Sequence, residues 1–219
     1  MNIALLGYGK MGQLIEEIAT QSGHSIIYIA NSKHIVDDID FSKVDVAIDF
    51  STPTTAFKNI STTLAQAVPV VSGTTGWLDK MEDINQLTTK NNTAFLYASN
   101  FSVGVNLFFE LNKKLKSIMD SHPQYKTHIR EIHHTEKLDA PSGTALSLQS
   151  QIDKNTPIDS ERIKGVPGTH FVEYTSDIDT ISISHEAHNR NGFAKGALMA
   201  AEWIVNKKGI FKMSDVLKL

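Results

Sequence analysis

The sequence predicts an α/β protein in two parts, a doubly wound parallel sheet with helices on both faces and a smaller α+β domain. Three observations predict this fold class. Short apolar runs alternate five times with amphipathic segments up to about residue 101. A glycine-rich turn joins the first apolar run to the first amphipathic segment. After Phe101 the alternation stops, and a long amphipathic segment leads into β-rich runs.

The first half is expected to contain five strands. Ile3–Leu6 is apolar throughout, which is typical of a parallel strand buried on both faces. Apolar residues then recur at helical spacing, and Gly23 is a plausible helix stop. A second helix should begin at Ser51-Thr52-Pro53, a cap followed by proline at the first helical position. The remaining strands are expected at Ser25–Ala30, Val44–Phe50, Val68–Val71 and Thr93–Ala98, with a further helix around Met81, Ile84 and Leu87.

The second half is expected to be mixed. A helix from Val103 to about Met119 precedes a histidine-rich strand near Lys126–His134 and a helix from about Ser142. Two β-rich runs follow, His170–Thr175 and Thr180–His188. A last helix, Phe193–Val205, carries one apolar stripe, and we expect it to return to the first domain. The predicted domains are therefore residues 1–101, with 190–219 returning to them, and residues 102–189.

The bulk composition favours a soluble protein that binds small molecules. The chain has 219 residues, 41% hydrophobic and 21% charged, with a net charge of −3, which offers no strong basic field for nucleic acid or an anionic membrane. It has no cysteine, so disulfides and thiolate chemistry are excluded. No signal-peptide pattern or membrane-spanning run is present. We expect a cytoplasmic protein with no nucleic-acid or membrane partner.

The glycine-rich turn predicts a dinucleotide site. Its residues are Gly7, Tyr8, Gly9, Lys10, Met11 and Gly12. Glycines let the backbone turn tightly and approach a pyrophosphate, and the following helix offers unpaired N–H groups to that anion. The GxGxxG string alone is weak evidence, but here it lies between an apolar strand and an amphipathic helix, as the motif requires.

The end of the second predicted strand bears on which coenzyme binds. An acidic residue usually holds the adenosine ribose there, but this chain has Asn31-Ser32-Lys33. Without the carboxylate a 2′-phosphate is not repelled, and Lys33 could pair with it. NADPH is therefore at least as plausible as NADH. Alternatively, Lys33 is a solvated surface charge.

Two further turns follow apolar strands, Gly73-Thr74-Thr75-Gly76 and Ala98-Ser99-Asn100-Phe101. In a doubly wound fold ligands bind along the carboxyl ends of the strands, so these turns are candidates for contacts with the nicotinamide and its ribose. As isolated strings they are ordinary turns, and only their position favours the functional interpretation.

The segment Glu131–Ala145, EIHHTEKLDAPSGTA, contains the groups that a reductase needs. His133 can exchange a proton near neutral pH, and Lys137 can donate one or neutralise a carboxylate. Ser142-Gly143-Thr144 should begin a helix whose free N–H groups suit a carboxylate. Adjacent His133 and His134 can line one pocket only where the strand ends or twists. The alternative is a polar strand edge followed by an ordinary helix cap.

Paired histidines also bind metals in other folds. The pair here lacks a third ligand at a recognisable spacing, so the sequence predicts no metal site.

Several motifs, in order, resemble those of the 4-hydroxy-tetrahydrodipicolinate reductases, also called dihydrodipicolinate reductases. The similarity runs nearly end to end. The most specific motif is His133-His134-x-x-Lys137-x-Asp139-Ala140-Pro141-Ser142-Gly143-Thr144-Ala145. The others are GYGKMG, GTTG, SNFSVGVN (Ser99–Asn106) and the late His185-x-Ala187 with Gly192-Phe193-Ala194-x-Gly196-Ala197.

The resemblance implies a Rossmann-type domain and a substrate and oligomerisation domain whose open mixed sheet assembles a homotetramer. It implies reduction of a cyclic, imine-type dicarboxylate by NADH or NADPH with loss of water, on the diaminopimelate route to lysine. By position, His133 is the expected general acid/base and Lys137 the proton donor. His134, Gly143 and Thr144 are the expected substrate anchors. Coenzyme contacts are expected at Gly7–Gly12, Gly73–Thr75 and Ala98–Phe101.

The chain also departs from the family pattern. Asn31 replaces the acidic ribose-binding residue, which leaves the coenzyme preference open, and Glu136 stands between His133 and Lys137. Two other functions remain possible, a non-catalytic dinucleotide-binding sensor and a reductase of another small cyclic acid.

Overall fold

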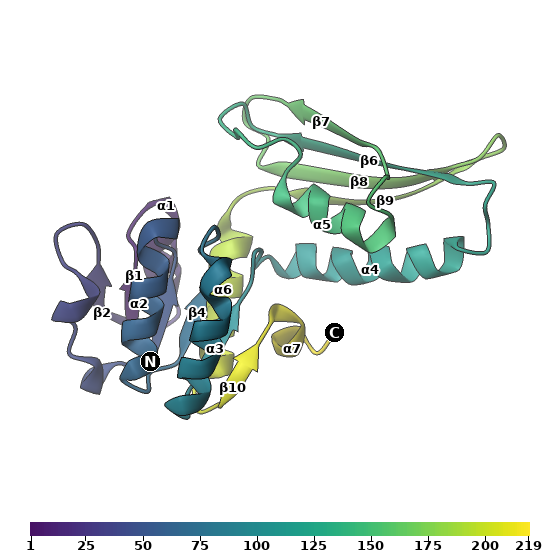
Figure 1. Cartoon of the computed structure of the whole chain (residues 1–219). Coiled ribbons are helices and arrows are strands. Elements are labelled where there is room, and N and C mark those ends of the chain that lie inside the picture. The colour runs from purple at the N-terminus through teal and green to yellow at the C-terminus, as the bar shows by residue number, and fades with distance from the viewer. The chain divides into compact units, whose positions relative to one another are not determined.

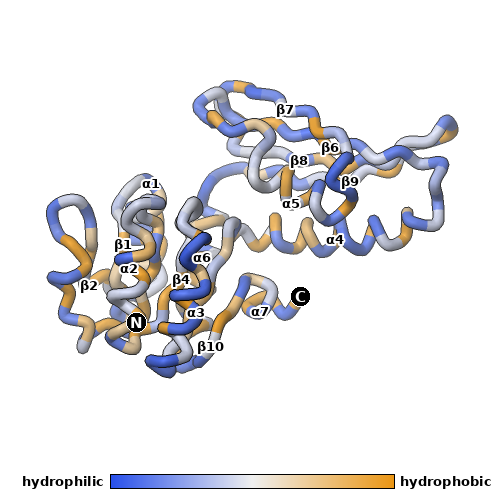
Figure 2. The backbone as a smooth tube through the Cα atoms, in the orientation of Figure 1, coloured by the Kyte–Doolittle hydropathy of each residue, from blue (hydrophilic) through white to orange (hydrophobic).

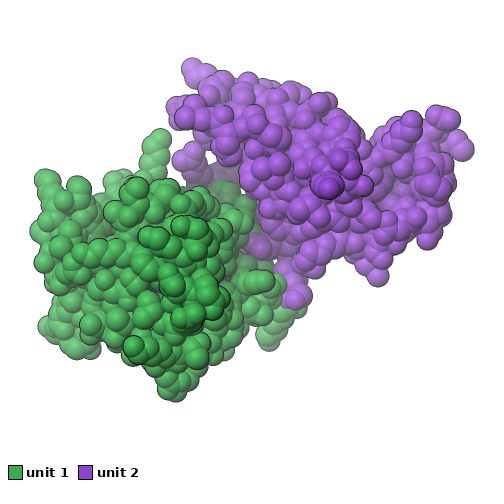
Figure 3. Space-filling model, viewed as in Figure 1, with its two compact units in different colours: residues 1–102, 193–218 green, residues 103–192, 219 purple.

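The computed structural model describes the whole chain, residues 1–219, and divides it into two compact units (Figures 1 and 3). Unit 1 comprises Met1–Ser102 and Phe193–Lys218, and unit 2 comprises Val103–Gly192 with Leu219. The C-terminal part of the chain is thus part of the same compact unit as the N-terminal part. No helix is both long enough and apolar enough to cross a membrane.

Unit 1 is built on a six-stranded sheet in which every neighbouring pair is parallel. Its order is β10-β5-β4-β3-β1-β2. The strands are β1 (Asn2–Leu6), β2 (Ser25–Ala30), β3 (Val46–Asp49), β4 (Val70–Ser72), β5 (Ala94–Tyr97) and β10 (Gly209–Phe211). Because β2 lies on one side of β1 and β3 on the other, the strand order reverses at β1, and ligands of such sheets bind at the carboxyl ends there.

Helices cover both faces of this sheet, as predicted. They are α1 (Lys10–Gln21), α2 (Pro53–Ala65), α3 (Met81–Lys90), α6 (Asn191–Ile204) and α7 (Met213–Leu217). Alternate residues of β1 enter different cores: Ile3 and Leu5 pack with α1, α6 and α7, whereas Ala4 and Leu6 pack with α2 and α3. This two-sided burial explains why the strands are apolar throughout.

Unit 2 contains a four-stranded sheet of order β7-β6-β8-β9. The strands are β6 (Lys126–His133), β7 (Ile158–Arg162), β8 (Gly168–Thr175) and β9 (Thr180–Ala187). The β6–β7 pair is parallel and the other two pairs are antiparallel, so the sheet is mixed. Two helices, α4 (Val103–Met119) and α5 (Gly143–Ile152), lie along one face of this sheet (Figure 1).

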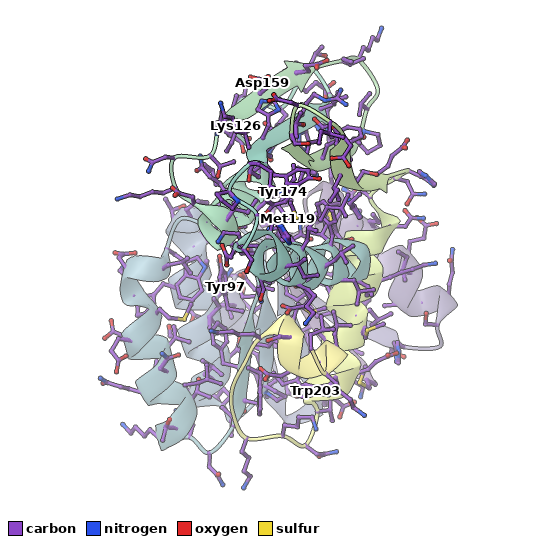
Figure 4. The ribbon with its side chains drawn as sticks, turned by 90° about the vertical axis from the view of Figure 1, so that its right-hand side faces the viewer. Tyr97, Met119, Lys126, Asp159, Tyr174 and Trp203 are labelled. Atoms are coloured by element: carbon purple, nitrogen blue, oxygen red, sulfur yellow. The ribbon has the colours of Figure 1, made fainter.

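The core of unit 2 lies between that sheet face and the two helices. It includes Phe108 and Met119 of α4, Leu148 of α5 and Tyr174 of β8. In Figure 4 Tyr174 lies close to Met119, the last residue of α4. Hydrophobic and hydrophilic stretches alternate along α4 in Figure 2. On the opposite sheet face, the guanidinium of Arg130 lies over the ring of Phe171, 4.1 Å from its centroid.

The predicted fold class is confirmed, and the element bounds differ by a few residues at most. The third strand is shorter than Val44–Phe50, and the fourth is Val70–Ser72 rather than Val68–Val71. Strands β7 and β10, helix α7 and three single-turn 3₁₀ helices were not predicted. The 3₁₀ helices are Val36–Asp38, Phe41–Lys43 and Leu78–Lys80.

Candidate active site

The glycine turn of unit 1 is shaped by close backbone packing. Gly7 has φ +101°, and a Cβ there would lie 2.3 Å from the carbonyl oxygen of Phe50 at the end of β3. A Cβ on Gly12 would lie 2.4 Å from the carbonyl oxygen of Gly7. Glycine is therefore required at both positions to bring β1, β3 and α1 together.

Gly9 has a different role in the same turn. It is the N-cap of α1, no side chain caps that helix, and a Cβ on Gly9 would meet nothing within 4 Å. The first N–H groups of α1 and the positive end of its dipole therefore face open space, which suits the pyrophosphate of a dinucleotide.

A cavity of about 530 Å³ adjoins this turn. Its lining includes Gly7, Tyr8, Gly9 and Asn31 of the predicted coenzyme residues, together with Lys58 of α2. The side-chain oxygen of Asn31 accepts N–H groups from Lys33 at 2.8 Å and from His34 at 3.1 Å, so it shapes the turn after β2. Lys58, which sequence reasoning missed, is paired with Asp37.

The other two predicted coenzyme turns meet at the same edge of the sheet. A Cβ on Gly73 would lie 2.4 Å from the ring of Phe50 and 3.1 Å from the ring of Phe101. The two rings contact each other, with centroids 5.6 Å apart. Thr74 accepts the N–H of Ser51 through its hydroxyl, at 2.9 Å. These contacts therefore hold the carboxyl ends of β3, β4 and β5 close to one another.

In unit 2, β6 ends at His133, so His134 lies just beyond the strand. This is the strand end that both histidines need in order to line one pocket. His133 is buried, and its Nδ1 lies 3.1 Å from Oε2 of the fully buried Glu131. A Cβ on Gly168 would lie 2.9 Å from Nε2 of His133, so the absence of a side chain at the start of β8 leaves room for the imidazole.

The carboxylate of Glu131 is the centre of a polar cluster. Its Oε1 accepts the backbone N–H of Ser142 at 3.0 Å, the hydroxyl of Ser160 at 2.8 Å and Nη2 of Arg162 at 3.2 Å. Burial tends to raise the pKa of Glu131, but the hydrogen bonds from His133, Ser142 and Ser160 outweigh it and hold the pKa well below its usual range. Glu131 is therefore ionised at neutral pH.

His170 of β8 completes this cluster. Its Nε2 lies 3.3 Å from the hydroxyl oxygen of Ser142 and 3.8 Å from Glu131, and its ring packs against His133 with centroids 5.0 Å apart. Burial, with a contribution from nearby His133, lowers the pKa of His170 to about 4, so its imidazole is neutral at pH 7.

Lys137 and the start of α5 occupy the loop after β6. The Lys137 ammonium donates to both carboxylate oxygens of Asp139, at 2.8 and 2.9 Å, and this contact lowers the pKa of Asp139. The helix begins at Gly143, and the hydroxyl of its N-cap, Ser142, accepts the N–H of Ala145 at 3.2 Å. His134 contacts Arg190 at 3.1 Å.

Comparisons with known proteins decide the family. Residues 1–101 match the model for the N-terminus of dihydrodipicolinate reductase, and residues 104–217 match the model for its C-terminus. The chain belongs to this family. Among its relatives is a 4-hydroxy-tetrahydrodipicolinate reductase from Christiangramia forsetii, 50% identical over 99% of this chain and 98% of that protein. Another, from Thermosipho africanus, is 35% identical over 100% and 98%.

Solved structures show the same fold. A dipicolinate-bound dihydrodipicolinate reductase from Paenisporosarcina superposes with a TM-score of 0.78, covering 97% of each chain at 21% identity. Like the dihydrodipicolinate reductases, the chain is an oxidoreductase of a dinucleotide-binding family. The alternative of a non-catalytic sensor is therefore set aside.

The sequence predicted only part of the cluster around His133. Glu131 lies inside the motif, but the sequence predicted no role for it. Arg162 and His170 lie on the strands on either side of β6, and no local sequence pattern shows which strands pair with each other. The absence of a metal site, which was predicted from the pair His133 and His134, stays a prediction, because His134 does not belong to the group that the structure brings together. Ligand atoms of Glu131, His133 and His170 lie within 4.8 Å of one another, close enough to share a metal ion.

Proposed function

We propose that this chain reduces 4-hydroxy-tetrahydrodipicolinate to tetrahydrodipicolinate, with loss of water, in the diaminopimelate pathway to lysine. The observation that carries the proposal is the cluster at the end of β6. There, a buried histidine, a lysine and an uncrowded helix start follow one another within the segment Glu131–Ala145. The curated relatives that carry this reaction in their names cover nearly the whole chain.

The roles of the residues follow from their chemistry. His133 is the general acid/base, and Lys137 is the proton donor. His134 and the N–H groups and hydroxyl of Gly143 and Thr144 anchor the carboxylates of a small dicarboxylate. When bound, the reduced nicotinamide supplies the hydride. On substrate binding, the Lys137 ammonium would leave the carboxylate of Asp139 and bind a carboxylate of the substrate, because the two carboxylates offer the same acceptor atoms.

The coenzyme is NADH or NADPH, held at Gly7–Gly12, Asn31 and Lys33, Gly73–Thr75 and Ala98–Phe101. The open space at Gly9 and the uncapped start of α1 support this assignment for the pyrophosphate. Residues 1–101 and 190–219 would form the dinucleotide-binding domain, and residues 102–189 the substrate and oligomerisation domain. We propose no catalytic metal, because His133 and Lys137 provide the proton transfer and the reduced nicotinamide would provide the hydride.

We further propose a cytoplasmic homotetramer assembled through the open sheet of unit 2. The polar, half-buried face of β6 and β8, with Arg130 stacked on Phe171, is available for such an assembly. Light scattering coupled to size-exclusion chromatography measures the mass directly, and a monomer at assay concentrations would contradict the proposal.

A coupled assay tests the activity. The preceding synthase generates the unstable substrate in place, and oxidation of NADH and of NADPH is followed by ultraviolet absorbance. We expect substrate-dependent oxidation that survives treatment with a metal chelator. No oxidation with either coenzyme would refute the proposal, and turnover of a different cyclic acid alone would favour the remaining alternative reductase.

Lys137 provides the narrower test. Lys137→Ala should lower turnover by about 10²-fold or more, because the proton donor is lost, and leave coenzyme binding nearly unchanged. Steady-state kinetics and fluorescence titration with NADPH measure the two quantities. An equal loss of coenzyme affinity would show that the role is misassigned. Lys126→Ala, an exposed lysine at the other end of β6, is the control.

A further inference from the structure

Glu131 is a buried carboxylate that has no role in the reaction proposed above. A charge in such a place is costly unless it is paired and hydrogen-bonded. Its partners come from three different segments of unit 2: the end of β6, the residue before α5, and strand β7. Each segment supports a different part of the proposed substrate site.

The first partner is His133. Its Nδ1 lies 3.1 Å from Oε2 of Glu131 in an ion-pair contact, and no other group forms a hydrogen bond with either atom. An ionised carboxylate can only accept hydrogen bonds, so this contact favours the imidazole tautomer with hydrogen on Nδ1. The lone pair of the neutral ring is then on Nε2, the nitrogen turned away from Glu131.

The second partner is Arg162 at the end of β7. Its Nη2 donates to Oε1 of Glu131 at 3.2 Å and also to the carbonyl oxygen of Asp139, while its Nε donates to the carbonyl oxygen of Lys137 at 3.2 Å. One guanidinium therefore ties the loop that carries Lys137 to the carboxylate. Lysine cannot replace it, because an ammonium lacks the planar fork of donors.

The third partner is Ser142. Its backbone N–H donates to Oε1 of Glu131 at 3.0 Å, while its hydroxyl caps α5 and contacts His170. The carboxylate thereby holds the start of the helix, where Gly143 and Thr144 lie.

We propose that Glu131 is the positioning residue of this site. Through one carboxylate it selects the tautomer of His133, and it fixes the Lys137 loop by way of Arg162 and the start of α5 by way of Ser142. The inference deepens the proposed function and rests on it for the roles of these three parts. The contacts themselves do not depend on the substrate.

The decisive variant is Glu131→Gln. Gln keeps an oxygen for Ser142, Ser160 and Arg162 but turns an amide N–H₂ toward Nδ1 of His133. A donor facing a donor disfavours the Nδ1–H form, so the ring should change to the Nε2–H tautomer. Long-range proton–nitrogen NMR correlations on histidine-labelled protein at alkaline pH distinguish the two forms. The His133 signal is assigned with His133→Asn.

Activity gives the second readout. Glu131→Gln should lower kcat by about 10²-fold while the affinity for NADPH stays unchanged. Arg162→Lys should separate the two functions: it should lower kcat/KM about tenfold or more by freeing the Lys137 loop and leave the His133 tautomer as in the wild type. Glu161→Gln is the matched control, because the exposed side chain of this neighbour on β7 faces Arg130, at 3.9 Å, and the substitution leaves its backbone contact with Arg162 in place. It should change neither quantity.

The outcomes separate the two proposals. An Nε2–H tautomer in the wild-type protein, or a Glu131→Gln protein with wild-type tautomer and turnover, would overturn the role of Glu131. The wild-type tautomer and Arg162→Lys still decide the matter if Glu131→Gln does not fold. A wild-type protein that shows the Nδ1–H tautomer but never oxidises coenzyme would instead refute the proposed function and leave the Glu131 contact intact.

Discussion

Asn31 stands where an acidic residue usually binds the adenosine ribose, and the structure shows what its side chain does instead. Its oxygen accepts the N–H groups of Lys33 and His34. Asn31→Asp keeps the oxygen that accepts both N–H groups and adds a charge that repels a 2′-phosphate. We expect the ratio of kcat/KM for NADH to that for NADPH to rise about tenfold.

Lys33→Gln tests the other side of the same question. If Lys33 pairs with the 2′-phosphate, the variant should bind NADPH more weakly and bind NADH as tightly as the wild type does. A coenzyme ratio that both variants leave unchanged would remove this turn from the ribose site.

His170 makes a prediction about stability. Its pKa is about 4 in the folded protein and 6.5 as a free side chain, so the unfolded chain binds a proton that the folded chain does not. The free energy of unfolding should therefore fall as the pH drops from about 6.5 to 4, by about 3 kcal/mol from this group. Above pH 6.5 the group should have no effect.

Urea unfolding of the wild type and of His170→Gln across this range measures the difference. The variant should lose less stability on acidification. The same dependence in both proteins would show that His170 is not the group responsible. His122→Gln, an exposed histidine outside the cluster, serves as the control.

The glycine turn shows how one motif combines two physical requirements. Gly12→Ala places a methyl group 2.4 Å from the carbonyl oxygen of Gly7 and should lower the free energy of unfolding by about 1–3 kcal/mol. A Cβ on Gly9 meets nothing within 4 Å, so Gly9→Ala should change stability by no more than about 0.5 kcal/mol. It should instead weaken coenzyme binding about tenfold, because the methyl group occupies the approach of the pyrophosphate.

Thermal unfolding and coenzyme titration of both glycine variants separate the two effects. Equal loss of stability in both would contradict a binding role for Gly9.

The strands that the sequence predicted and the strands that it did not predict are stabilised in different ways. Strands β1 and β3 are buried on both faces and are apolar throughout, so their sequences predict them. Strand β7, Ile-Asp-Ser-Glu-Arg, is mostly exposed and is a strand because it pairs with β6. Strand β10 has only three residues and depends on β5. A local pattern cannot reveal a strand that its neighbour specifies.

The same limit applies to the candidate site. The order of motifs predicted His133, Lys137 and the start of α5 as a group. Arg162 and His170 join them only because β7 and β8 flank β6, and no spacing along the chain predicts that pairing. The contacts of Glu131 are therefore a product of the sheet order, although Glu131 itself lies within the motif.

At the scale of the whole molecule, unit 1 is assembled from both ends of the chain. Helix α6 supplies Ala194, Ala197 and Ile204 to the core on one face of the sheet, and α7 adds Met213 and Val216. Residues 1–102 alone would leave that face exposed to water, because only α1 would cover it. We expect this fragment not to fold cooperatively.

Joining residues 1–102 directly to 193–219 should restore the fold. The ends are close, since a Cβ on Gly196 of α6 would lie 1.8 Å from the carbonyl oxygen of Phe101, so a short Gly-Ser linker suffices. The shortened protein should unfold cooperatively by circular dichroism and bind coenzyme while lacking reductase activity, because the His133 cluster lies in unit 2. Cooperative unfolding of residues 1–102 alone, or a shortened protein that stays unfolded, would mean that the returning segment does not complete the core as its burial indicates.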